Sequence, residues 1–281
     1  MKKVSNSPIK WIKQFPFKKK NSHKYSRGQL IVVGGQKNMI GATILSCEAA
    51  LRTGVGSVKI LCDKKTLPIY SMKFPSLLKE EINSFNKFKK FVNNNKKAVY
   101  LIGPGAGSSA QTKKKTDYIL KKIKYVVIDA DALTCFKNDQ KKLYRLLDSS
   151  KIITPHVKEF KTIFPKLKNE NNNNKAIEKA VKQVNCTIVL KSNISYIANK
   201  DFLSVNDKST KELAVIGSGD VLAGLISSLV GEKKLNPFMA SCAGVWMHSE
   251  IGNKSGTAII SEDLIKNIKS TLKKMYARFV E

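Results

Sequence analysis

Short apolar runs rich in β-branched residues alternate with longer charged or amphipathic stretches along most of the chain. The runs predict buried strands, and the stretches between them predict helices. Strands and helices that alternate in this way form a wound, mostly parallel sheet, so we predict an α/β fold. The predicted strands are 29–33 (QLIVV), 57–61 (SVKIL), 98–103 (AVYLIG), 125–130 (YVVIDA), 151–155 (KIITP) and 187–192 (TIVLKS).

The last third of the chain has a different pattern. The runs SYIAN (195–199) and FLSVN (202–206) predict a hairpin that turns at 199–201. After the hairpin the chain is predicted to be helical, at 219–230, about 237–251 and 261–279.

Two kinds of segment are predicted between the strands earlier in the chain. One is a helix at 42–54, ended by Gly54. The others are charged, asparagine-rich surface helices or loops at 79–97 and 166–182.

Neither a repeat nor a linker divides the chain. We therefore predict a basic N-terminal arm, residues 1–21, followed by one domain, residues 22–281. The hydrophobic share of 42% is ordinary for a soluble globular protein. No apolar run reaches the roughly 18 residues that span a bilayer, and residues 1–21 lack the continuous apolar region of a signal peptide.

The cysteines are scattered, odd in number and never in a C-x-x-C pair. This pattern predicts free thiols in a reducing compartment, the cytoplasm, and argues against a zinc site. They are Cys47, Cys62, Cys135, Cys186 and Cys242.

The formal net charge of +30 is large enough to attract polyanions. The lysines, however, are spread along the whole chain and alternate with asparagines, and no nucleic-acid-binding motif accompanies them. We therefore interpret the excess as charge on solvated faces and expect no specific nucleic-acid partner. The charge should still favour anionic substrates such as nucleotides.

Glycine-rich or polar loops follow four of the predicted strands. Each alone could be a tight turn, but ligands of open α/β sheets bind beyond the carboxyl ends of the strands. Four such loops on one edge predict a large, phosphate-bearing ligand. The loops are 34–42 (GGQKNMIGA), 103–107 (GPGAG), 129–133 (DADAL) and 154–156 (TPH).

Three side chains in these loops have two interpretations each. His156 follows Thr-Pro at a strand end, which favours a ligand contact over a structural role. Asp129 and Asp131 could bind Mg²⁺, but acids after a buried strand also cap turns.

Asp220 follows a Gly-Ser-Gly turn and opens an apolar helix, in the stretch LAVIGSGDVLAGLISSLV (213–230). An acid in the first helical turn is a favoured cap. The free amides and the dipole of the helix start also form an anion hole, beside which Asp220 could act as a general base. The motif alone leaves both roles open.

The segments SHKYSRGQLIVVGGQKNMIGA, LIGPGAG, VIDADAL, TPHVKEF, IVLKSNIS and GSGDVLAG occur in this order. Together they resemble the motifs of the ADP/ATP-dependent NAD(P)H-hydrate dehydratases, metabolite-repair enzymes of the ribokinase-like superfamily. The resemblance covers about residues 22–270. It implies a three-layer α/β/α fold with a mostly parallel central sheet, and a stand-alone form without the companion epimerase domain.

The resemblance also implies a reaction. The S epimer of hydrated NADH or NADPH would be dehydrated to NAD(P)H at the expense of a nucleotide. With ADP, the cosubstrate expected here, the products are AMP and phosphate, whereas eukaryotic members use ATP. Mg²⁺ is expected as the divalent cation, without assigned ligands.

Roles for individual residues follow from the same resemblance. Asp220 would deprotonate or orient the substrate hydroxyl, beside an anion hole formed by the amides of Gly217, Ser218 and Gly219. The implied contacts to the hydrated dinucleotide are Ala42, Gly105, His156 and Asp220. The implied contacts to the AMP portion of the nucleotide are Lys191, Ser192, Asn193, Ile194, Ser195 and Gly219.

Four departures from the family pattern bear on nucleotide affinity and on the choice between ADP and ATP. The phosphoryl hole and its acid are retained. The departures are Ser192 for the glycine of K-G-x-x-T, Ile216 for a glycine before Gly217, Lys158 for the glycine of TPH-x-G-E-F, and 206–212 (NDKSTKE) for a glycine-rich loop.

Two other functions stay open. A superfamily kinase acting on a vitamin-precursor alcohol would share GSGD, but would not be expected to share GPGAG, DADAL and TPH together. A polyanion-binding protein with a vestigial enzyme core would bind nucleic acid in a salt-dependent way and be indifferent to Asp220. A homo-oligomer, by the resemblance a homotetramer, is also expected, since 237–252 (PFMASCAGVWMHSEIG) suits an interface as well as a core.

Overall fold

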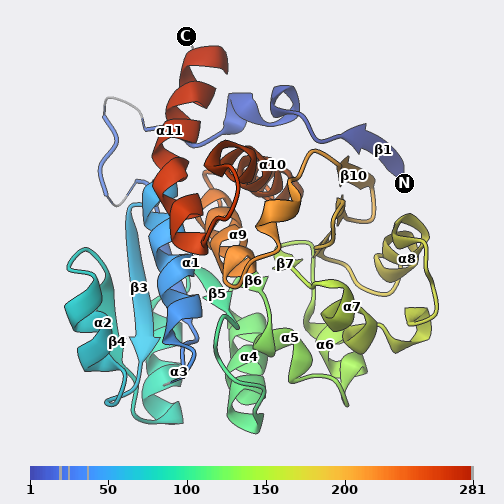
Figure 1. Ribbon diagram of the computed structural model, residues 1–281. Coiled ribbons are helices and arrows are strands. Elements are labelled where there is room, and N and C mark those ends of the chain that lie inside the picture. The colour runs from blue at the N-terminus through green and yellow to red at the C-terminus, as the bar shows by residue number, and fades with distance from the viewer. Residues whose placement is uncertain (19–20, 25, 37, 280–281) are drawn as a thin grey trace.

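The computed structural model describes residues 1–18, 21–24, 26–36 and 38–279 (Figure 1). Lys19 and Lys20 of the predicted arm, and Tyr25 and Lys37 of the quoted motifs, lie outside the described residues. The strands are β1 (Lys2–Ser5), β2 (Gln29–Val33), β3 (Ser57–Cys62), β4 (Leu78–Glu81), β5 (Val99–Ile102), β6 (Val126–Ile128), β7 (Lys151–Ile153), β8 (Thr187–Leu190), β9 (Ser195–Ala198) and β10 (Phe202–Asn206).

All of these strands belong to one sheet, in the order β1-β10-β9-β8-β7-β6-β5-β2-β3-β4. Pairing is parallel from β8 to β4, whereas β9 is antiparallel to both of its neighbours. The predicted hairpin is therefore confirmed. Asn199 shapes its turn, because the side-chain oxygen accepts hydrogen bonds from the amides of Asp201 and Phe202.

Helices cover both faces of the sheet. One core joins α1, α9, α10 and α11 to one face, and a second core joins α3 to α8 to the other. The helices are α1 (Ile40–Thr53), α2 (Leu67–Lys73), α3 (Phe85–Asn94), α4 (Ala110–Lys122), α5 (Asp131–Thr134), α6 (Gln140–Leu146), α7 (Val157–Ile163), α8 (Asn173–Ala180), α9 (Ser218–Leu229), α10 (Pro237–Ser255) and α11 (Ser261–Phe279), with 3-10 turns η1 (Pro8–Lys10), η2 (Ile12–Gln14), η3 (Pro165–Leu167) and η4 (Lys211–Leu213).

Strand β2 shows why the runs are apolar without alternation. Leu30 and Val32 face one core while Ile31 and Val33 face the other, so the strand is buried on both sides. The three-layer α/β/α fold is confirmed. Helix α1 ends as predicted at Gly54, which has φ +109° in the left-handed region that glycine favours.

Strand β4 corrects one prediction. The stretch 79–97 was predicted as surface helices or loops, but Leu78–Glu81 pairs with β3 at the sheet edge before α3 begins. Its sequence, LKEE, is charged because an edge strand is largely solvated, and Glu80 forms an ion pair with Lys59 of β3 at 3.3 Å.

The segment predicted as a basic arm contributes to the sheet and to a core. Strand β1 pairs in parallel with β10 at the other edge. Trp11 is 1% exposed and packs against Trp246 of α10, with ring centroids 5.7 Å apart. Residues 2–15 are thus docked on the layer that contains α10 and α11 (Figure 1).

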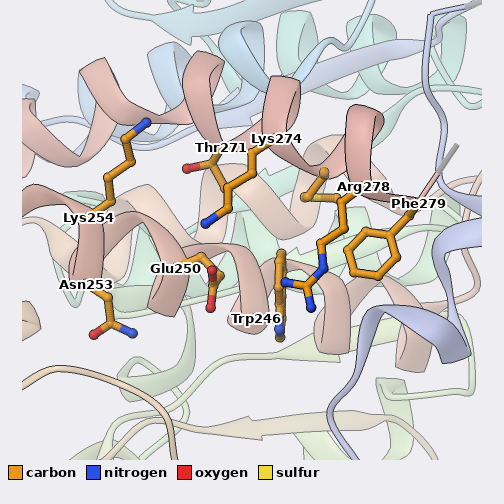
Figure 2. Close-up of a pocket in the computed structure, with 9 residues that line it drawn as sticks. Trp246, Glu250, Asn253, Lys254, Thr271, Lys274, Arg278 and Phe279 are labelled. Atoms are coloured by element: carbon orange, nitrogen blue, oxygen red, sulfur yellow. The ribbon is translucent and has the colours of Figure 1, made fainter. Parts of the chain in front are cut away.

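Helix α10 is mainly a core helix in this chain, with Trp246 at the edge of its buried face. Between α10 and α11 lies a hollow of about 420 Å³ (Figure 2). None of the residues that line it belongs to the strand-end loops. Within the described ranges, no helix is both long and apolar enough to traverse a bilayer.

Candidate active site

The four loops singled out from the sequence lie on one edge of the sheet. They follow β2, β5, β6 and β7, which are consecutive, parallel neighbours. A bridge between His156 and Lys191 extends the same edge to β8. The convergence of these loops, predicted from their position after strands, is confirmed.

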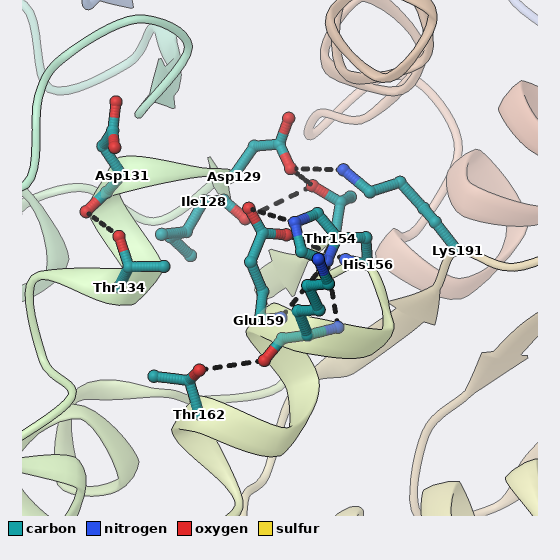
Figure 3. Close-up of polar contacts among 10 residues, drawn as sticks. Ile128, Asp129, Asp131, Thr134, Thr154, His156, Glu159, Thr162 and Lys191 are labelled. Carbon is teal, nitrogen blue, oxygen red and sulfur yellow. Dashed lines mark hydrogen bonds and ion pairs between the residues drawn. The ribbon is translucent and has the colours of Figure 1, made fainter. Parts of the chain in front are cut away.

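Lys191, which is partly buried, and Asp129 form an ion pair at this edge (Figure 3). The ammonium lies 2.7 Å from a carboxylate oxygen of Asp129, which also accepts a hydrogen bond from the hydroxyl of Thr154 at 2.8 Å. Asp129 is 1% exposed. Burial alone would lower the pKa of Lys191, but the carboxylates of Asp129 and Glu159 outweigh it and raise that pKa above its usual value.

Asp131 connects two of the loops. Its carboxylate accepts a hydrogen bond from the amide of Gly107 at 2.8 Å. Between the two acids, Ala130 has φ +48°, a conformation that alanine adopts at a cost. Both acids thus have protein partners, and nowhere in 1–18, 21–24, 26–36 and 38–279 do three or more His, Cys, Asp or Glu side chains gather as a metal site.

His156 begins α7 in a capping box. Its Nδ1 accepts hydrogen bonds from the amides of Lys158 and Glu159, and Glu159 accepts one from the amide of His156 at 2.8 Å. Nδ1 is therefore the acceptor of a neutral ring. Burial and the nearby Lys191 lower the pKa of His156, which favours that form. Half of the side chain is exposed, so a contact with a ligand stays a prediction.

Asp220 lies in the first turn of α9, but Gly217 is the N-cap residue. Within the described residues, its carboxylate has no hydrogen-bond partner, so it does not act as a side-chain cap. Burial and the charge of Asp129 raise the pKa of Asp220 to about 7, against the opposing effect of Lys191. A carboxyl that titrates near neutral pH suits a general base.

The start of α9 is fixed by contacts with α1 and α10. Ser46 of α1 donates a hydrogen bond to the carbonyl of Asp220 at 2.9 Å and lies 3.1 Å from the carbonyl of Ala42. The hydroxyl of Ser218 lies 3.0 Å from Nε2 of His248, and both side chains are buried. The predicted residues Ala42 and Asp220 are therefore brought together through Ser46.

Two glycines at the site cannot carry side chains. Gly217 has φ +86°, and a Cβ there would lie 2.4 Å from Leu45. Gly105 has φ +60°, and a Cβ there would lie 2.2 Å from the carbonyl oxygen of Met39. Both positions require glycine for backbone conformation as well as for space.

The stretch 191–195, predicted to hold the nucleotide, forms the tight connection from β8 to β9. Lys191 points inward, and a Cβ on Gly219 would lie 3.3 Å from its ammonium. The hydroxyl of Ser192 bonds to the carbonyl of Ile194, Asn193 and Ile194 are exposed, and Ser195 begins β9. Lys191 thus faces both Asp129 and the start of α9.

Two of the departures from the family pattern, Ile216 and Lys158, project outward. Ile216 is 98% exposed, and its carbonyl accepts a hydrogen bond from Ser261 at 2.7 Å. Lys158 is also exposed, in the first turn of α7. Neither side chain narrows the space at the start of α9.

Sequence reasoning did not single out Glu159, although it stands in the quoted segment TPHVKEF. It is 8% exposed, and burial raises the pKa of its carboxyl above the usual range. Its spacing of three residues from His156 is that of a capping box, although the usual sequence signature has Ser, Thr, Asp or Asn in place of the histidine. His248 lies within the predicted helix at about 237–251, but its partner Ser218 is 30 residues away, so no local pattern indicates its role.

A model of the NAD(P)H-hydrate dehydratase family matches residues 30–273. The chain belongs to this family. It is 32% identical over 242 residues to an ADP-dependent (S)-NAD(P)H-hydrate dehydratase of Neisseria meningitidis, covering 83% of this chain and 79% of that one. It is 30% identical to a bifunctional NAD(P)H-hydrate repair enzyme of Methanocaldococcus jannaschii, matching 90% of this chain and about half (50%) of that enzyme.

Solved structures agree on the fold of this dehydratase-family chain. A ribokinase-like superfamily protein from Enterococcus faecalis has a TM-score of 0.83 at 22% identity, covering 97% of this chain and 95% of that one. An ADP/ATP-dependent NAD(P)H-hydrate dehydratase from Bacillus subtilis, co-crystallised with ATP and Mg²⁺, has a TM-score of 0.77 at 22% identity, covering 94% and 95%. The ribokinase-like fold predicted from the resemblance is confirmed.

Proposed function

We propose that this chain catalyses the ADP-dependent dehydration of the S epimer of hydrated NADH or NADPH, a metabolite-repair reaction that releases AMP and phosphate. The observation that carries the proposal is the position of the Asp220 carboxyl in the first turn of α9, beside the helix-start amides and without a hydrogen-bond partner in the described residues. Burial and the charge of Asp129 raise its pKa to about 7. Membership of the NAD(P)H-hydrate dehydratase family and the relative from N. meningitidis support the choice of reaction and of ADP.

The chemistry assigned to Asp220 begins with proton removal. Asp220 takes the proton of the ring hydroxyl, whose oxygen attacks the terminal phosphorus of ADP, and the bond to AMP breaks. In this step the amides of Gly217 and Gly219 serve as helix-start donors that stabilise negative charge on the transferring phosphoryl group. The amide of Ser218 instead donates to the carbonyl of Val215 at 3.3 Å. Phosphate then leaves the ring together with a proton from the neighbouring carbon, which restores the double bond of NAD(P)H.

Mg²⁺ belongs to the proposal as a cation carried by the nucleotide. Asp129 and Asp131 already bind Lys191 and the amide of Gly107, respectively. They therefore offer Mg²⁺ a few carboxylate oxygens that also have protein partners, and not a complete set of protein ligands. Mg²⁺ commonly binds through one or two carboxylates and substrate phosphates, and these residues fit that mode. When bound there, the cation would neutralise charge on the phosphates.

The proposal is tested with purified protein, hydrated NADH or NADPH, Mg²⁺ and either ADP or ATP. Recovery of the reduced cofactor is followed at 340 nm. We expect recovery with ADP, and formation of AMP and phosphate in equal amounts. Absence of recovery with both nucleotides and both hydrates would refute the dehydratase assignment.

We expect His248→Ala to lower kcat about tenfold, because the buried hydroxyl of Ser218 loses its partner and the start of α9 shifts. His248→Gln, which keeps a hydrogen-bonding group, should recover most of the rate. Glu250→Ala, two residues further along α10, is the matched control and should behave like the wild type. Equal rates for His248→Ala and the wild type would show that Ser218 is held without the imidazole.

A further inference from the structure

A second cavity, of about 710 Å³, opens at the edge of the sheet that carries the strand-end loops. It lies beyond β2, β3 and β4, and the first turns of α4 close its side. Its volume is in the range of small-molecule sites.

This cavity adjoins the candidate active site through the loop after β5. The amide of Gly35 donates to the carbonyl of Pro104 at 3.0 Å, and the amide of Gln36 donates to the carbonyl of Gly105 at 2.7 Å. Gly35, Gln36 and Ala106 all line the cavity. Three strand spacings, about 14 Å in all, separate β3 from β6, which Asp129 directly follows. A ligand anchored at Asp220 that passes over Gly105 therefore enters the cavity with its far end.

The lining suits a purine with a phosphate. Ile82, Phe88 and Ile102 supply apolar surface, and Lys64, Lys65 and Lys115 supply positive charge. Asp63 is the acid among the described lining residues. Its carboxylate is already bound by the amide and hydroxyl of Thr66, at 2.8 and 2.9 Å. The net charge of the lining is thus positive.

Lys115 is a partly buried lysine whose charge is not neutralised by a neighbouring acid of the described residues. Its ammonium lies 5.7 Å from the ring centre of Phe88, and it has no ion-pair partner within the described residues. Burial lowers the pKa of Lys115, and the charge of Asp63 offsets this only in part. A bound phosphate would supply the missing negative charge.

We propose that this cavity binds the adenosine half of the substrate dinucleotide and that Lys64, Lys65 and Lys115 contact a 2′-phosphate. Hydrated NADPH is then preferred over hydrated NADH. This inference rests on the proposed function for the identity of the substrate, but the phosphate site can be tested without turnover.

The test measures the binding of adenosine 2′,5′-bisphosphate and of 5′-AMP by calorimetry, in the presence of saturating ADP. We expect the wild type to bind the bisphosphate at least about tenfold more tightly than AMP. Lys115→Met and the pair Lys64→Gln, Lys65→Gln should each remove most of this difference. Lys122→Gln, an exposed lysine on the same helix, is the matched control and should leave it unchanged. The Lys64 and Lys65 side chains are exposed, so their loss does not threaten folding.

The kinetic counterpart is the ratio of kcat/KM for hydrated NADPH to that for hydrated NADH. Lys115→Met should lower this ratio about tenfold, through KM for hydrated NADPH. Equal binding of bisphosphate and AMP by the wild type, or an unchanged ratio in Lys115→Met, would overturn the phosphate site. If the bisphosphate binds as expected but neither hydrate is converted, the dehydratase assignment fails and the phosphate site stands.

Discussion

Asp220→Asn is expected to regenerate NAD(P)H from its hydrate at least about 100-fold more slowly than the wild type. The amide keeps the size of the carboxyl but cannot accept the hydroxyl proton. Because the main chain of residue 220 is held by Ser46, the start of α9 should keep its shape in the variant. The comparison is made from initial rates at 340 nm with saturating ADP. A rate close to that of the wild type would leave Asp220 with only a helix-start role.

The pH dependence gives an independent readout of the same carboxyl. Asp220 acts as a base only when ionised, so the rate should fall as the pH drops through about 7. The folded-state pKa lies above the unfolded value, so this group favours folding at low pH and loses that contribution as the pH rises through 7. Asp220→Asn should therefore melt at a higher temperature than the wild type at pH 8, and the difference should shrink toward pH 5.

Lys191→Met is expected to lower the free energy of unfolding by about 3–5 kcal/mol, because it leaves the buried carboxylate of Asp129 without its cation. The same change removes the positive charge that faces Gly219 and Asp220, so the rate should fall as well. Stability is measured by urea denaturation at pH 7, and activity under the same buffer conditions.

A double variant separates the charge from the packing. Adding Asp129→Asn to Lys191→Met removes the uncompensated charge, so more than half of the lost stability should return while activity stays low. Lys200→Met, in the exposed turn between β9 and β10, is the control for a lysine with no ion pair to any described residue and should change stability little. A Lys191→Met protein as stable as the wild type would show that Asp129 is satisfied by Thr154 alone.

The central sheet was predictable because its strands are buried on both faces. A strand such as β2, with Leu30 and Ile31 in different cores, has to be apolar throughout, and such runs are conspicuous in a lysine-rich chain. The strand-end loops followed from the same logic, since parallel strands bring their carboxyl ends to one edge.

The sheet edges were not predictable in this way. Strand β4 has the sequence LKEE and β1 has the sequence KKVS, neither of which shows the apolar pattern of a strand. Each is a strand only because it pairs with one neighbouring strand. Their partners, β3 and β10, are specified by tertiary packing, which no local pattern reports. Burial of Trp11 also depends on Trp246, far along the chain.

Within the site, residue types in motifs were easier to predict than their partners. Asp220 and Lys191 were singled out, but the ion pair of Lys191 with Asp129 joins residues 62 apart in sequence. The raised pKa of Asp220 depends on burial and on that neighbouring charge, both products of the fold. The roles assigned to 191–195, Ala42 and His156 toward ligands stay predictions.

The pairing of β1 with β10 has a consequence for synthesis of the chain. Asn6 and Asn206, 200 positions apart, are bonded side chain to side chain beside these strands. At about 5–20 residues per second, a ribosome needs roughly 10–40 s to add the residues between them. During that interval the side chain of Trp11 stays exposed, because α10, which covers it in the folded protein, has not yet been synthesised. The amino-terminal strand is thus among the last parts of the sheet to be paired, and nascent chains would expose the apolar residues that follow it, Trp11, Ile12 and Phe15, to chaperones.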